Sequence, residues 1–242
     1  MEHRFRFFGQ PHAGDDHLWH VVGEEFFHLK KVLRLKEGDW VELCDGNGRW
    51  GSGQILELTR EEARVRLSEF RTEEEKTPRL VLALGALQPA TMADLIPMLV
   101  EVGISEVHVF AQQGTARSAN SDKLRERWIR IAANSLKQCK RVHLPSFHSW
   151  PSLKDFVEKS GKCADGVLIL NPDGESSILD VGLPKTSVLT VVLGSEKGLL
   201  ESDQSSLQGV ACQSVSLGTA VLRSFTAAIL AVGILTLKRD LG

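Results

Sequence analysis

Two apolar segments near the end of the chain each run directly into a glycine, and this pattern limits the fold more than any other feature. The run Val188–Leu193 ends at the turn GSEKG over residues 194–198, and the segment 213–217 ends at Gly218. An apolar stretch with a helical pattern follows over residues 219–237. In a parallel sheet the ends of such strands meet at one edge, where α/β proteins bind ligands. Because glycine lets a backbone approach a ligand closely, the sequence predicts a small-molecule site built from these two loops.

From residue 79 onward the chain alternates strand patterns with helix patterns. Strands are predicted at residues 80–84, 106–110 and 167–170, and helices at residues 91–102, 121–140 and 153–159. We expect Pro97 to interrupt the first of these helices, because proline lacks the backbone N–H that a helix uses. The uninterrupted apolar run at residues 80–84 is typical of a sheet covered on both faces. The sequence therefore predicts an α/β domain with a parallel sheet.

The N-terminal third has a different pattern and predicts a small β-rich domain. Strand-like alternation occurs at residues 4–8, 40–43, 53–58 and 63–67. The turn residues DGNG at 45–48 connect two of these segments as a hairpin, because Asp-Gly and Asn-Gly accept a positive φ. Residues 24–35 are predicted to form one short helix with Phe27, Val32 and Leu35 facing inward. The charged segment 73–78, which ends in proline, is the predicted linker.

Composition narrows the class of protein further. The chain has 242 residues, 42% of them hydrophobic, and its 29 basic residues nearly balance 31 acidic ones, so any contact with nucleic acid must rest on local charge. Its cysteines, Cys44, Cys139, Cys163 and Cys212, form no C-x-x-C pair. We therefore expect no metal site, no disulfide framework and a cytoplasmic location. The longest uncharged apolar stretch, residues 227–237, falls short of the roughly 20 residues that a membrane span needs, so no membrane partner is expected.

One predicted helix carries a stripe of positive charge. The basic side chains Lys123, Arg127, Arg130, Lys137 and Arg141 recur at helical spacing. The neighbouring face presents Leu124, Trp128, Ile131 and Ser135, which we expect to point inward. A one-sided basic ridge favours contact with RNA phosphates, although a solvated helix face is the common alternative for such a charge run.

Several blocks of residues together resemble the RsmE group of the SPOUT RNA methyltransferases. The blocks are HLKKVLRLKEGD from His28, LVEVGISEV from Leu99, RWIRIAANSLKQCKR from Arg127, LGSEKG from Leu193 and LGTAVLRSFTA from Leu217. Their order and spacing extend the resemblance over nearly the whole chain. That group uses S-adenosyl-L-methionine to methylate N3 of a uridine in 16S (small-subunit) ribosomal RNA, either free or in the small ribosomal subunit.

The resemblance implies a fold and an assembly. Residues 75–242 would form a SPOUT domain, a trefoil-knotted parallel sheet whose C-terminal helix passes through an earlier loop. Residues 1–74 would form a PUA-like β-barrel that contacts RNA. The protein would be a homodimer, with the C-terminal helices packed at its interface.

The glycine loops, the basic stripe and the resemblance together suggest roles for particular residues. The cofactor would be bound by Leu170, Leu193, Gly194, Glu196, Gly198, Leu217, Gly218 and Leu222. RNA would be contacted by His28, Lys31, Arg34, Lys123, Arg127, Arg130, Lys137 and Gln138. Arg223 and Arg141 would stabilise the charge that develops on the uridine, and Arg141 would come from the second subunit. No general base is identified, and Ser224 and Thr226 are expected to be ordinary helix residues.

The chain departs from the group at several positions, and these leave alternatives open. The group usually has Gly-Pro-Glu-Gly-Gly where this chain has GSEKG, and a glutamate where this chain has Phe225. We expect cofactor binding to persist because it relies on backbone groups. A SPOUT enzyme that methylates another RNA atom, and a knotted protein that only binds RNA, are the competing hypotheses. An NAD-dependent enzyme is disfavoured, because no strand runs into a complete G-x-G-x-x-G motif.

Overall fold

The computed structural model describes residues 4–113, 122–163, 165–184 and 187–242, and the chain divides into two compact units. The first unit comprises Met1–Glu75 together with Leu136–Leu144, and the second comprises Lys76–Ser135 and Pro145–Gly242. The predicted fold class, α/β with a parallel-sheet domain and a β-rich N-terminal domain, is confirmed. None of the helices in the described ranges combines the length and apolar character needed to cross a membrane.

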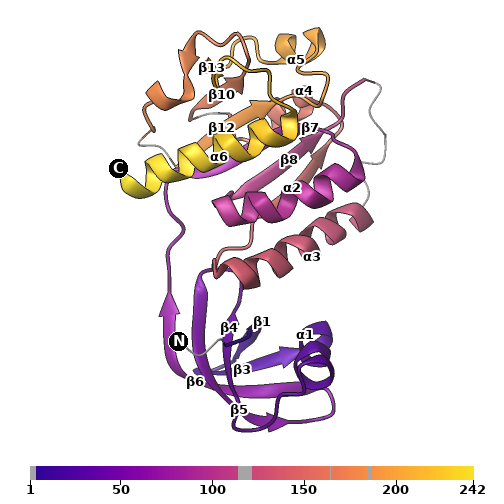
Figure 1. Ribbon diagram of the computed structural model, residues 1–242, viewed down its shortest axis with the longest axis vertical. Helices are drawn as coiled ribbons and strands as arrows, with labels where there is room; N and C mark the ends of the chain where they lie inside the picture. The colour runs from indigo at the N-terminus through magenta and orange to yellow at the C-terminus, as the bar shows by residue number, and fades with distance from the viewer. Residues whose placement is uncertain (1–3, 114–121, 164, 185–186) are drawn as a thin grey trace. The chain divides into compact units, whose positions relative to one another are not determined.

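The N-terminal unit is a curled six-stranded sheet (Figure 1). Its strands are β1 Arg6–Phe8, β2 Gln10–His12, β3 Asp15–Val22, β4 Trp40–Cys44, β5 Arg49–Leu58 and β6 Glu62–Thr72. They lie in the order β1-β4-β5-β6-β3-β2, so the two edge strands are separated in sequence by Gly9 alone. The sheet must curl to bring its edges together, as a PUA-like barrel requires. Its core includes Phe7, Trp19, Leu43 and Ile55.

The predicted helix of this unit differs from expectation. It begins as the α-helix α1, Gly23–Phe27, and continues as the π-helix η1, His28–Val32. Phe26 and Leu29 face the core and Leu35 packs against it, but Phe27 and Val32 are 61% and 58% exposed, so their predicted inward orientation was wrong. The wider π turn changes which side chains share a face, and α-helical periodicity cannot anticipate it.

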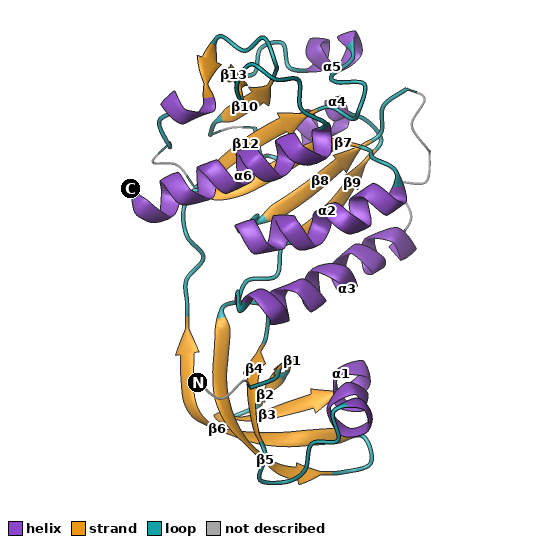
Figure 2. Ribbon diagram, in the orientation of Figure 1, coloured by secondary structure: helices purple, strands orange, loops and turns teal. Residues whose placement is uncertain are grey.

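The C-terminal unit contains a seven-stranded, all-parallel sheet with helices on both faces (Figure 2). Its strands are β7 Arg79–Gly85, β8 Glu106–Phe110, β9 Ser146–Trp150, β10 Val167–Leu170, β11 Ser176–Ser177, β12 Val188–Leu193 and β13 Cys212–Ser216. They lie in the order β11-β13-β10-β12-β7-β8-β9. Its helices are α2 Pro89–Val102, α3 Asp122–Cys139, α4 Leu153–Lys159, α5 Glu201–Ser206 and α6 Ser224–Leu241, with the short 3-10 helix η3 at Ile178–Asp180. Helix α2 packs against α6, and α4 packs against α5.

The strand order implies that the end of the chain passes through an earlier loop. The chain joins β10 to β11 through residues 171–175, yet β13 lies between these two strands and pairs with both. Helix α6 then runs beside η3, where Lys238 Nζ donates to the backbone oxygens of Leu179 and Val181. This threading is what the predicted trefoil knot requires.

Two helices in this unit differ from the sequence prediction, one at an internal proline and one at its first residue. Helix α2 continues through Pro97 without interruption, because the proline removes only its own donor while buried residues such as Leu95 and Leu99 hold the helix against the sheet. Helix α6 begins at Ser224 instead of residue 219, since Gly218 has a φ of 120° and Arg223 an extended backbone. Residue 121, the predicted first residue of the third helix, lies outside the described residues.

Candidate functional site

Three loops at the carboxyl ends of neighbouring parallel strands surround the candidate site. Strand β12 leads into residues 194–198, β10 into Asn171 and Pro172, and β13 into residues 217–223. The first loop closes on itself, with Gly198 N donating to Ser195 O. It requires glycine at Gly194, where a Cβ atom would lie 2.1 Å from the carbonyl carbon of Gly198. Glycine at this position thus allows the loop to turn tightly on itself, in addition to the close approach to a ligand for which the sequence analysis invoked it.

These loops line a cavity of about 800 Å³. Its wall includes Leu170, Leu193, Gly194, Glu196, Gly198 and Leu222. A smaller adjoining cavity of about 50 Å³ is lined by Leu217 and Gly218, and shares Leu170, Leu193 and Leu222 with the larger one. The structure therefore gathers all eight predicted cofactor-binding residues around two adjoining hollows. Apolar walls and backbone groups predominate, and the larger volume suits a metabolite-sized ligand.

The two predicted catalytic arginines belong to different units. Arg223 is exposed at the N-cap of α6 and lines the larger cavity, so it precedes the helix that was expected to contain it. Arg141 follows the end of α3 in the N-terminal unit, where its backbone oxygen accepts a hydrogen bond from Arg6. Of the two predicted catalytic arginines, Arg223 lies at the cavity and belongs to the C-terminal unit, whereas Arg141 belongs to the N-terminal unit.

The basic stripe on α3 is divided by the fold. Lys123, Arg127 and Arg130 are exposed, and the predicted inward face is confirmed by the burial of Trp128 and Ser135. Lys137 belongs to the N-terminal unit and forms an ion pair with Glu25, which leaves its side chain only 13% exposed. Gln138, the next residue, is exposed. Three of the five cations of the stripe are therefore presented to solvent, while Lys137 is engaged in an ion pair and Arg141 follows the helix in the N-terminal unit.

The remaining predicted RNA contacts share one surface segment of the N-terminal unit. His28 and Lys31 lie in η1 and Arg34 follows it with a φ of 55°, and all three are exposed. The exposed apolar side chains of Phe27 and Val32 lie in the same segment. It combines positive charge with exposed apolar surface, the kind of surface that contacts both phosphates and bases.

Sequence reasoning missed two side chains that hold the cavity loop: Gln112, which lies behind it, and Ser224, which also lines the cavity. Gln112, which follows the end of β8, is only 7% exposed and hydrogen bonds to Ser195 N and Gly198 O. Ser224 is 6% exposed and its hydroxyl donates to Ser195 O. The position of Gln112 at a further strand end on the same edge of the sheet was the one signal available in the sequence.

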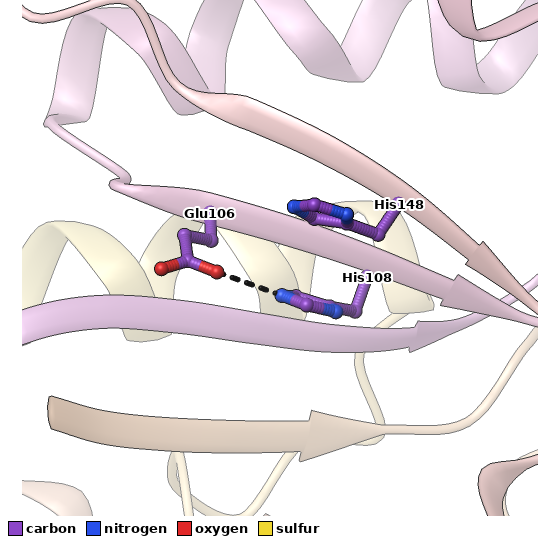
Figure 3. A group of neighbouring side chains, drawn as sticks. All are labelled: Glu106, His108 and His148. Atoms are coloured by element: carbon purple, nitrogen blue, oxygen red, sulfur yellow. Dashed lines mark hydrogen bonds and ion pairs between the residues drawn. The ribbon is translucent and has the colours of Figure 1, made fainter. Parts of the chain in front are cut away.

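A separate cluster of titratable groups lies on β8 and β9, and none of its members lines either cavity. Glu106, the first residue of β8, accepts a hydrogen bond from His108 Nε2, and His148 stacks on His108 with ring centroids 4.6 Å apart (Figure 3). Trp150 donates to His108 Nδ1, so His108 is neutral with its proton on Nε2. Lys162 and Arg79 form ion pairs with Glu106. Although two histidines and a carboxylate match a metal-ligand set, two cations and two hydrogen bonds already engage these atoms, as in an internal ion-pair network.

Comparison with known proteins adds a family match over both parts of the chain. A family model described as an RNA methyltransferase domain matches residues 73–236, and one described as an RNA methyltransferase PUA domain matches residues 23–68.

Individual relatives agree with this match. The chain is 27% identical over 237 residues to Ribosomal RNA small subunit methyltransferase E of Bacillus subtilis (strain 168), covering 91% of this chain and 90% of that protein. It is 28% identical over 233 residues to the protein of the same name from Mycobacterium tuberculosis (strain CDC 1551 / Oshkosh), covering 91% and 87%. A crystal structure of Ribosomal RNA small subunit methyltransferase E from Neisseria gonorrhoeae bound to S-adenosyl methionine has a similar fold, with a TM-score of 0.81, 20% identity, and coverage of 96% and 97%.

Proposed function

Because this chain belongs to the RNA methyltransferase family, we propose that it methylates N3 of a specific uridine in 16S ribosomal RNA, using S-adenosyl-L-methionine. Two features support this target: the names of the relatives and the blocks of sequence shared with the RsmE group. The main structural support for this function is the cavity formed where three strand ends meet at one edge of the parallel sheet.

The cavity has the properties that this cofactor needs. Leu170, Leu193, Leu217 and Leu222 supply apolar walls for an adenine ring. Gly194, Gly198 and Gly218 bring main-chain groups to its surface, where they would hydrogen bond to the adenine edge and the ribose, and Glu196 lies in the same rim. When bound, S-adenosyl-L-methionine supplies an electrophilic methyl group. The protein's part is to orient both reactants and to exclude water.

Arg223 is assigned the electrostatic role in the reaction. Uridine N3 carries a proton, and its loss leaves a negative charge shared with O2 and O4. A guanidinium group at the cavity rim would stabilise that charge and lower the barrier to methyl transfer. Arg141 of the partner subunit would act with it in a homodimer. The exposed side chains of Leu230, Leu237 and Leu241 on α6 support a dimer interface along this helix.

The RNA would be held by both domains. Residues 1–74 form the proposed PUA-like RNA-contacting domain and residues 75–242 the proposed methyltransferase domain. His28, Lys31 and Arg34 would contact RNA in the first, and the stripe of Lys123, Arg127 and Arg130 would bind phosphates in the second, with Lys137 and Gln138 at its end. A protein with this substrate would act in the cytoplasm.

Two measurements test the proposed function directly. Calorimetry with S-adenosyl-L-methionine should show binding to the isolated protein. Mass spectrometry of 16S ribosomal RNA from a deletion strain should show one uridine lacking its N3 methyl group, restored when the gene is returned. A modification missing at another position would identify a different target, and cofactor binding with no missing modification would identify a protein that only binds RNA.

Replacement of Arg223 by alanine should abolish methyl transfer while leaving cofactor binding largely intact. The side chain lies at the rim of the cavity, whereas the predicted cofactor contacts come mainly from the backbone and the leucines. The measurements are the rate of methyl transfer to 16S ribosomal RNA and the calorimetric Kd for S-adenosyl-L-methionine. A variant with the wild-type rate would remove this arginine from the mechanism.

A further inference from the structure

The backbone of Ser195 is held at both its N–H and its carbonyl oxygen by buried side chains. Its N–H donates to Gln112 Oε1 at 3.0 Å, and its carbonyl oxygen accepts from Ser224 Oγ at 2.7 Å. Ser195 itself is 2% exposed. Because Ser195 lies within the loop that lines the cavity, these two bonds fix the loop, one from Gln112 behind it and one from Ser224, which lines the cavity itself.

Both the oxygen and the nitrogen of the Gln112 carboxamide have hydrogen-bond partners of the right kind. Its oxygen accepts from Ser195 N, while its Nε2 donates to Gly198 O and to the buried carboxylate of Asp203. The same carboxylate accepts from Leu200 N at the start of α5. A carboxylate in place of the carboxamide would have no hydrogen to donate to Gly198 or Asp203, and it would add a negative charge beside Asp203.

The approach of Gln112 to the loop also depends on Gly85 at the end of β7. A Cβ atom at this position would lie 2.4 Å from Ser195 N and 2.5 Å from Gln112 Oε1. The absence of a side chain therefore leaves room for the hydrogen bond between Gln112 and Ser195. Two strand ends thus cooperate in placing the loop that follows a third.

Ser224 connects the same loop to the arginine at the cavity rim. It is the first residue of α6, directly after Arg223, and its hydroxyl reaches Ser195 O. This bond fixes the entry into α6 against the loop 194–198. The position of Arg223 relative to the cavity therefore depends on Ser224, which sequence reasoning had treated as an ordinary helix residue.

We propose that Gln112 and Ser224 are positioning residues for methyl transfer. Gln112 holds the loop 194–198 in the shape that binds the cofactor, and Ser224 fixes Arg223 against that loop. This inference rests on the proposed function and extends it to residues that do not belong to the cavity-lining glycine loops. It predicts different kinetic consequences for the two side chains: loss of Gln112 weakens cofactor binding, and loss of Ser224 slows the reaction.

The first test replaces Gln112 by glutamate, with Gln113→Glu as the matched control, since Gln113 is the exposed neighbour. The Kd for S-adenosyl-L-methionine should rise at least about tenfold in Gln112→Glu, equivalent to about 1.4 kcal/mol, and stay unchanged in the control. Gln112→Met, which removes the oxygen that accepts from Ser195 N, should also show lost hydrogen-exchange protection of the Ser195 amide without cofactor. If Gln112→Glu does not fold, Gln112→Met keeps the length without adding charge and carries the same expectation.

The second test replaces Ser224 by alanine and by threonine. The alanine variant should lose at least about tenfold in kcat with little change in the cofactor Kd, and threonine, which keeps a hydroxyl, should restore kcat. Ser205→Ala is the matched control, because this serine also donates to a backbone oxygen but lies on the exposed side of α5.

The outcomes separate the inference from the proposed function. If the wild-type protein binds no S-adenosyl-L-methionine, the proposed function fails. If it binds, wild-type affinity in Gln112→Glu together with wild-type amide protection in Gln112→Met refutes the role of Gln112 while the function stands. Wild-type kcat in Ser224→Ala, or a loss that threonine does not restore, refutes the role of Ser224.

Discussion

Glu106 is a buried side chain that remains charged in the interior of the protein. Its side chain is 5% exposed, and burial alone would raise its pKa. Hydrogen bonds from His108 and Lys162, with the charges of Lys162 and Arg79, outweigh burial and lower the pKa of Glu106 to about 2. The carboxylate therefore stays ionised, and it ties together the starts of β7 and β8 and the segment before β10.

Replacement of Glu106 by glutamine should reduce the free energy of unfolding by about 3 kcal/mol at pH 7. A carboxyl group with a depressed folded pKa stabilises the protein above its ordinary pKa of 4.5, and that contribution is lost as pH falls toward about 2. The difference between variant and wild type should therefore shrink between pH 7 and pH 3, as measured by urea unfolding. Glu158→Gln, at an exposed site, is the control, and a difference independent of pH would contradict the assignment.

At the scale of the elements, one glycine allows the crossing that threads the chain. Gly174 lies in the connection from β10 to β11, where it passes over β13. A Cβ atom at this position would lie 2.4 Å from the carbonyl carbon of Val215 and 2.6 Å from Ser216 N, both backbone atoms that cannot rotate away. The close crossing therefore excludes every residue with a side chain unless the strand shifts.

Replacement of Gly174 by alanine should lower the free energy of unfolding by about 2 kcal/mol or more, in the range that forced overpacking costs. Gly182→Ala is the matched control, because Gly182 lies in the later connection from η3 to β12 and a Cβ atom there would meet nothing within 4 Å. Denaturant unfolding of both variants measures the effect. Equal stability of the two variants would show that the crossing relaxes without cost.

The strands that the sequence analysis located differ from those it missed in how continuous their apolar pattern is. The strands β7, β10 and β12 are continuous apolar runs, and their patterns located them to within a residue or two. Strands β3 and β9 were missed because histidine and other polar residues break their alternation. The glycine loops identified the edge of the sheet that holds the cavity. Gln112 and Ser224 could not be identified in this way, because they contact Ser195 from sequence distances of 83 and 29 residues, respectively. No local pattern reports such contacts.

At the scale of the whole molecule, three exposed cations of the α3 stripe are available to nucleic acid, whereas the exposed Arg125 of the same helix pairs with Asp122. Replacement of Lys123, Arg127 and Arg130 by glutamine should weaken binding of 16S ribosomal RNA. It should also reduce the slope of log K against log salt by about 2, at about 0.7 per phosphate contact for single strands. A salt titration of RNA binding measures both quantities.

The control for that prediction removes the same charge elsewhere in the C-terminal unit. Lys76, Lys154 and Lys159 are exposed and form surface ion pairs, whose loss costs little stability. Their replacement by glutamine should leave the salt slope close to that of the wild type. If both triple variants change the slope equally, the α3 stripe has no special part in RNA binding.

The N-terminal unit is assembled from two stretches of chain that lie 60 residues apart in sequence, Met1–Glu75 and Leu136–Leu144. The second stretch is bonded into the first: Gly48 N donates to Val142 O, Leu144 N donates to Gly46 O, and Lys140 pairs with Glu42. A fragment that stopped at residue 75 would therefore expose donors and acceptors that the intact chain satisfies. Each unit is made of two separate stretches of chain, so neither can be replaced by the corresponding unit of a related protein as one continuous segment. A chimeric protein would have to exchange both stretches of a unit together.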